Sequence, residues 1–107
     1  MIVVTSNEVP GREISDCLGL VRGTTVRARH LGQHIRGIFK SFVGGEVHEY
    51  TKLVAEAREE ALDRMKAEAF AKGADAVIGF RFATSEVAKN AAEIVAYGTA
   101  VQLLENE

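Results

Sequence analysis

The sequence predicts a single α+β domain, residues 1–107, in which an antiparallel sheet packs on one long and one short helix. The composition, with 47% hydrophobic and 26% charged residues, is that of an ordinary globular protein. Residues 46–72 repeat apolar side chains at helical spacing, and two later stretches alternate like strands. A chain of 107 residues has material for only one core.

The N-terminal part predicts two short strands joined by a turn. The β-branched run from Ile2 to Thr5 is typical of a strand, and Pro10-Gly11 is typical of the centre of a type II turn. The run from Leu18 to Val26 predicts a second strand. Its glycines, Gly19 and Gly23, suggest a bend or bulge.

Two helices are predicted in the middle of the chain. The short one, from Leu31 to Phe42, has five apolar residues on one face, and Gly44-Gly45 ends it. The long one, from Glu46 to Lys72, has Gly73 at its C-cap and the i, i+4 ion pairs Glu60–Arg64 and Glu68–Lys72. At 1.5 Å per residue it spans roughly 40 Å, so part of it is expected to extend beyond its own core.

The C-terminal part predicts a hairpin of strands Ala76–Thr84 and Ile94–Leu104, joined by a polar connection, residues 85–92. In the first strand, Ile78, Phe80 and Phe82 are expected to share one face. The second strand is apolar on both faces. Two helices can cover only one face of such a sheet, and small residues such as Gly98 would allow close approach of another chain. We therefore expect a homo-oligomer.

The chain has neither a secretory leader nor an apolar stretch long enough for a membrane span, so it is expected to be cytoplasmic, without membrane contact. Its single cysteine, Cys17, fits a reducing compartment. Residues 17–45 carry five cations and no acid, whereas acids outnumber bases from residue 46 onward. Since aromatics are not interleaved with the cations, a solvated face or an interface complementary to the acidic part is favoured over a nucleic-acid surface.

The candidate metal ligands are Cys17, His30, His34 and His48. His30 and His34 stand four residues apart, a spacing that can clamp a divalent transition metal on one side of a helix. However, no HExxH arrangement is present, and exposed or core-edge histidines are the simpler interpretation. The acidic group Glu56, Glu59, Glu60 and Asp63 would suit a hard cation, although a solvated helix face is favoured.

Arg58 projects close to the apolar stripe of the long helix, near Val54 and Ala61. Either it forms a structural ion pair, with Asp75, Glu93 or Glu13, or it binds an anion. The sequence contains no P-loop, GxGxxG or GxSxG motif and no recognisable nucleophile beside a base. A role without catalysis is therefore favoured.

Six segments in order resemble the YbjQ-like family of small prokaryotic proteins. They are Val9-Pro10-Gly11, residues 18–23, residues 43–46, residues 56–61, residues 73–79 and residues 97–101. The resemblance implies a dodecin-like subunit that joins a ring, typically a pentamer, and it carries a heavy-metal-binding label. Relatives can have a cysteine at the position of Cys17, and they can have Asn and Asp at those of His30 and His34.

Three functions follow from these observations. The first is a homopentameric binding or scaffolding protein without catalysis, whose small ligand the sequence does not identify. The second is a heavy-metal-binding protein that uses Cys17, the histidines or both. The third is an enzyme with a pocket between subunits.

Overall fold

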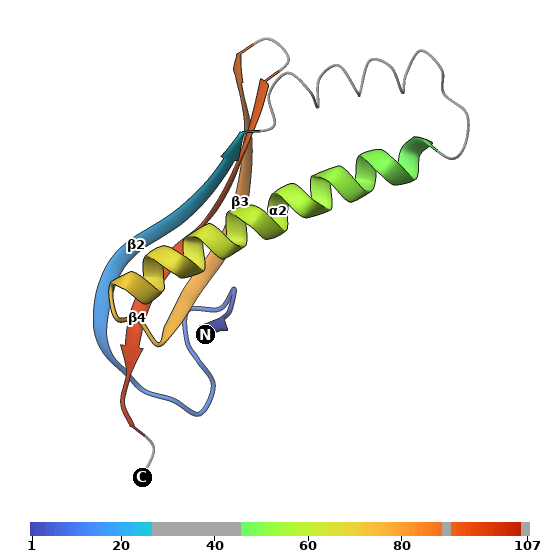
Figure 1. The fold of residues 1–107 in the computed structure, drawn as a ribbon. Coiled ribbons are helices and arrows are strands. Elements are labelled where there is room, and N and C mark those ends of the chain that lie inside the picture. Colours follow the sequence, from blue (N-terminus) through green and yellow to red (C-terminus); the bar gives the residue numbers. More distant parts are fainter. Residues whose placement is uncertain (27–45, 89–90, 106–107) are drawn as a thin grey trace.

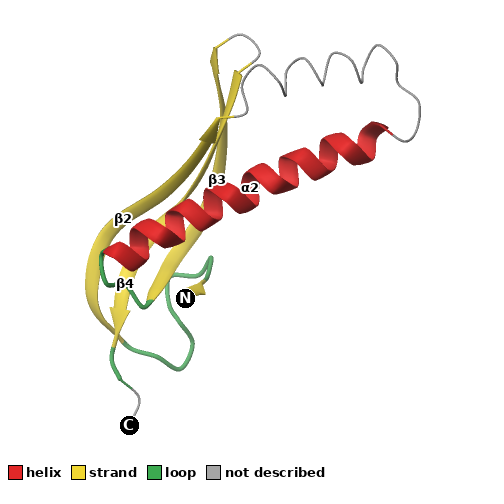
Figure 2. Cartoon of the chain, viewed as in Figure 1, coloured by secondary structure: helices red, strands yellow, loops and turns green. Residues whose placement is uncertain are grey.

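The computed structural model describes residues 1–26, 46–88 and 91–105. Their elements are β1 (Ile2–Val3), β2 (Ile14–Val26), α2 (Glu46–Ala71), β3 (Ala76–Ala88) and β4 (Ala91–Leu103). The four strands form one sheet in the order β1-β3-β4-β2, and α2 lies across one of its faces (Figures 1 and 2). The predicted α+β class is confirmed, although the parallel pairing of β1 with β3 makes the sheet mixed. The short helix predicted at residues 31–42 lies outside the described residues.

The N-terminal segment forms the predicted turn but only a two-residue strand. The Arg12 N–H donates to the Val9 carbonyl at 3.0 Å, and Gly11 has a φ of 79°, as a type II turn requires. β2 begins at Ile14, earlier than predicted, and its register shifts between Cys17 and Gly19. The predicted irregularity at Gly19 is therefore confirmed, with a φ of 94° at that residue.

The long helix α2 ends as its sequence predicts. The Gly73 N–H donates to the Phe70 carbonyl and the Ala74 N–H to the Ala69 carbonyl, each at 3.0 Å. With a φ of 81° at Gly73, these bonds form a Schellman cap. At the other end, the turns near Glu46 extend away from the sheet (Figure 1), so the predicted overhang is present.

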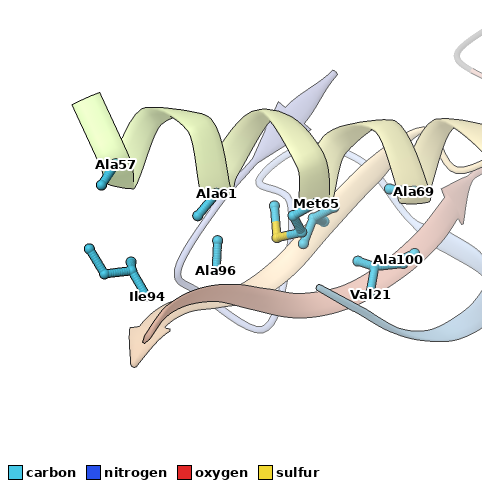
Figure 3. Packing of buried hydrophobic residues seen from close by; sticks show 9 residues of the cluster. Val21, Ala57, Ala61, Met65, Ala69, Ile94, Ala96 and Ala100 are labelled. Atoms are coloured by element: carbon cyan, nitrogen blue, oxygen red, sulfur yellow. The ribbon is translucent and has the colours of Figure 1, made fainter. Parts of the chain in front are cut away.

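Small side chains bring α2 close to the sheet. Ala57, Ala61, Met65 and Ala69 are fully buried on one face of the helix, and they pack on residues of β2 and β4 (Figure 3). We call this face of the sheet the inner face. Its members Ala96 and Ala100 are fully buried in the same cluster. The small residues of β4 were expected to allow close approach of another chain. They instead allow close approach of α2 from the same chain.

The hairpin is longer than predicted. β3 continues to Ala88 and β4 starts at Ala91, so residues 85–88 belong to a strand and the predicted polar connection is wrong. Ser85 pairs with Glu93 and Glu86 with Ala92. Antiparallel pairing with β4 thus holds these polar residues in the sheet despite their weak strand propensity.

A bulge at Gly79 reverses the predicted faces of β3. Ile78 pairs with Thr99, whereas Arg81 pairs with Tyr97, so one extra residue lies on β3 between these pairs. Gly79 has a φ of 61°, which glycine adopts readily. Because the extra residue shifts the alternation, Phe82 and Ile78 lie on opposite faces, and the prediction that they share one is wrong.

The face opposite α2, which we call the outer face, is covered only in part. Val9 packs on Ala76, Val101 and Leu103, and the half-buried Val4 and Ile14 join this second cluster. The N-terminal segment therefore shields the end of the outer face near the C-terminus of β4. The expectation that the chain offers no cover for this face is wrong for that end.

Candidate functional site

The rest of the outer face carries large apolar side chains in contact with solvent. Leu20 is 58% exposed, Val26 54% and Tyr97 36%. Leu20 and Val26 lie an even number of residues apart on β2, and Tyr97 pairs across to Arg22 between them, so all three project from the same face. We call Leu20, Val26 and Tyr97 the outer patch.

The helix α2 packs on the inner face of the sheet, so it leaves the outer patch uncovered within the described residues. Lys72 Nζ donates to the Leu20 carbonyl at 3.2 Å, and Arg64 Nη1 donates to the Thr24 carbonyl. On the inner face, Thr25 Oγ1 donates to the Ala57 carbonyl at 3.1 Å. These bonds hold the helix over β2 from the inner side. Lys72 and Arg64 also bind two carbonyls on the free edge of β2. Carbonyls bound in this way are less available for pairing with another strand.

A row of two arginines and one tyrosine crosses the outer patch. Arg22 and Arg81 are both in register with Tyr97, one on each side of it. Both arginines are exposed. Arg81 Nη1 donates to the Thr5 and Phe80 carbonyls at 2.9 and 2.7 Å. Neither guanidinium forms an ion pair with a carboxylate of the described residues.

Sequence reasoning missed this row because it misplaced Arg81. Strict alternation along β3 gives no reason to place Arg81 and Ile78 on the same face. The Gly79 bulge does so, and only the pairing of β3 with β4 reveals it. The one available signal was a glycine inside a strand, which indicates a bulge without giving its position in the register.

The candidate metal ligands are not brought together in the described part of the chain. Cys17 is exposed on the outer face, forms no disulfide and is in register with Val101. His30 and His34 lie outside the described residues, as does the side chain of His48 within α2. Across the described ranges no group of three or more His, Cys, Asp or Glu residues is placed to hold a metal ion.

The charged residues of α2 divide into paired and unpaired sets. Glu60 contacts Arg64 at 2.8 Å and Glu68 contacts Lys72 at 4.0 Å, which confirms the predicted i, i+4 pairs. Arg58 is exposed and forms no ion pair with any described carboxylate, so its predicted structural pairing is not seen. One proposed partner, Asp75, instead accepts the Leu103 N–H at 2.9 Å. An exposed guanidinium is solvated without a counter-charge.

Comparison with known proteins assigns the chain to a family. The family model YbjQ_1, described as "Putative heavy-metal-binding", matches residues 1–104. The chain belongs to the YbjQ-like family. It is 55% identical over 103 residues to a UPF0145 protein of Fervidobacterium nodosum, covering 96% of this chain and 95% of that protein. A UPF0145 protein of Methanosarcina acetivorans is 50% identical over 104 residues, covering 97% and 98%. The predicted resemblance is thus confirmed.

The fold of this YbjQ-like chain also matches a solved structure. A protein of unknown function from Pediococcus pentosaceus, which belongs to the DUF74 family, superposes with a TM-score of 0.64 and 18% sequence identity. The match covers 97% of this chain and 98% of that one. At this identity the likeness concerns the fold alone. In the described part of the YbjQ-like chain, no helix combines the length and apolar character needed to cross a membrane.

Proposed function

We propose that this YbjQ-like protein is a self-assembling binding or scaffolding protein without catalysis, whose subunits cover one another's outer patch. The exposure of Leu20, Val26 and Tyr97 on one sheet face supports this proposal above all else. A soluble chain gains free energy by burying such a group, at about 25 cal/mol for each Å² of apolar surface. Following the family resemblance, the assembly is a ring of five subunits.

The proposal places this ring in the cytoplasm. A reducing compartment keeps an exposed lone thiol such as Cys17 from forming disulfides between rings.

The mass of the assembly in solution tests the proposal. Size-exclusion chromatography with light scattering is expected to give roughly five times the 11.6 kDa of one chain, with a closed ring leaving no larger species. A species of one subunit at micromolar concentration would contradict it. A stable assembly of another size would retain the self-association and reject the pentamer.

Heavy-metal binding is the second candidate, favoured by the family description and by the exposed thiol of Cys17. A ring would place several copies of each ligand around one axis, so a single thiol in each chain could contribute to a shared site. Metal analysis of protein purified without a histidine tag decides this candidate. Stoichiometric zinc, copper or nickel that is lost in Cys17→Ala would support it, and metal-free protein after incubation with these ions would reject it.

A further inference from the structure

We draw no further inference here: the strongest candidate, the apolar surface patch on the inner face of β3 beside α2, where the rings of Phe80 and Phe82 lie 4.9 Å apart and Phe82 is 41% exposed, carries nothing because the described part of the chain does not show what covers it.

Discussion

Gly23→Ala is expected to lower the free energy of unfolding by about 3 kcal/mol, since a methyl group has no space at this position. A Cβ on Gly23 would overlap the Ala61 carbonyl oxygen and the Met65 nitrogen, and it would lie 2.8 Å from the Arg64 carbonyl carbon. All three are backbone atoms of α2, so no side-chain rotation relieves the overlap. The helix must instead lift from β2 and lose part of its buried alanine contacts.

Urea unfolding at one fixed protein concentration measures this effect, because association contributes to the stability of an oligomer. Gly19→Ala is the matched control on the same strand. A Cβ there meets no atom within 4 Å, so only the positive φ of 94° is penalised. We expect a loss of about 1 kcal/mol for the control. Equal losses for the two variants would show that α2 does not rest on Gly23.

Leu20→Asp is expected to dissociate the assembly into single subunits that remain folded. The substitution places a carboxylate in the outer patch, which another subunit covers in the proposed assembly. We expect a cost of about 3 kcal/mol at every subunit contact, or roughly a hundredfold in the dissociation constant. Sedimentation velocity measures the change. Since Leu20 is 58% exposed within one chain, the helix content seen by circular dichroism should not change.

Leu104→Asp is the matched control for this experiment. Leu104 is 47% exposed, close to Leu20 in exposure, but it lies beyond the end of β4 and outside the outer patch. The sedimentation coefficient of this variant is expected to equal that of the wild type. Dissociation by Leu104→Asp, or persistence of the assembly in Leu20→Asp, would place the subunit contact elsewhere on the molecule.

The local elements of the fold could be predicted because their signals lie within a few residues of one another. The buried face of α2, its Schellman cap at Gly73 and the turn at Gly11 each depend on nearest neighbours in the chain. The two faces of β4 were also predicted, since no irregularity interrupts its alternation between Ile94 and Val101.

The properties that depend on strand pairing could not be predicted. The Gly79 bulge decides which face carries Arg81, and the pairing of Ser85 with Glu93 decides that a polar segment is a strand. The packing of Val9 over Val101 joins residues far apart in the sequence. For the same reason the row of Arg22, Tyr97 and Arg81 became visible only once the register was known.

The oligomer stays a prediction, and the surface that it would bury is smaller than the sequence suggested. The expectation treated the whole second face of the hairpin as uncovered, whereas the N-terminal segment shields the part around Val101. What stays exposed is a smaller patch centred on Tyr97. The structure gives less support to the candidate metal ligands, because Cys17 belongs to no group of three or more His, Cys, Asp or Glu residues among the described ranges.

The reaction rate of a cysteine placed in the outer patch measures most directly whether a second copy buries this face. Leu20→Cys and Glu8→Cys, each made with Cys17→Ser, carry one thiol apiece at positions that are exposed in the single chain. At a concentration where the protein is assembled, we predict that a maleimide reacts roughly tenfold or more slowly with the thiol at position 20 than at position 8. Equal rates at the two positions would mean that solvent reaches the outer patch, and they would contradict this account of how the protein assembles.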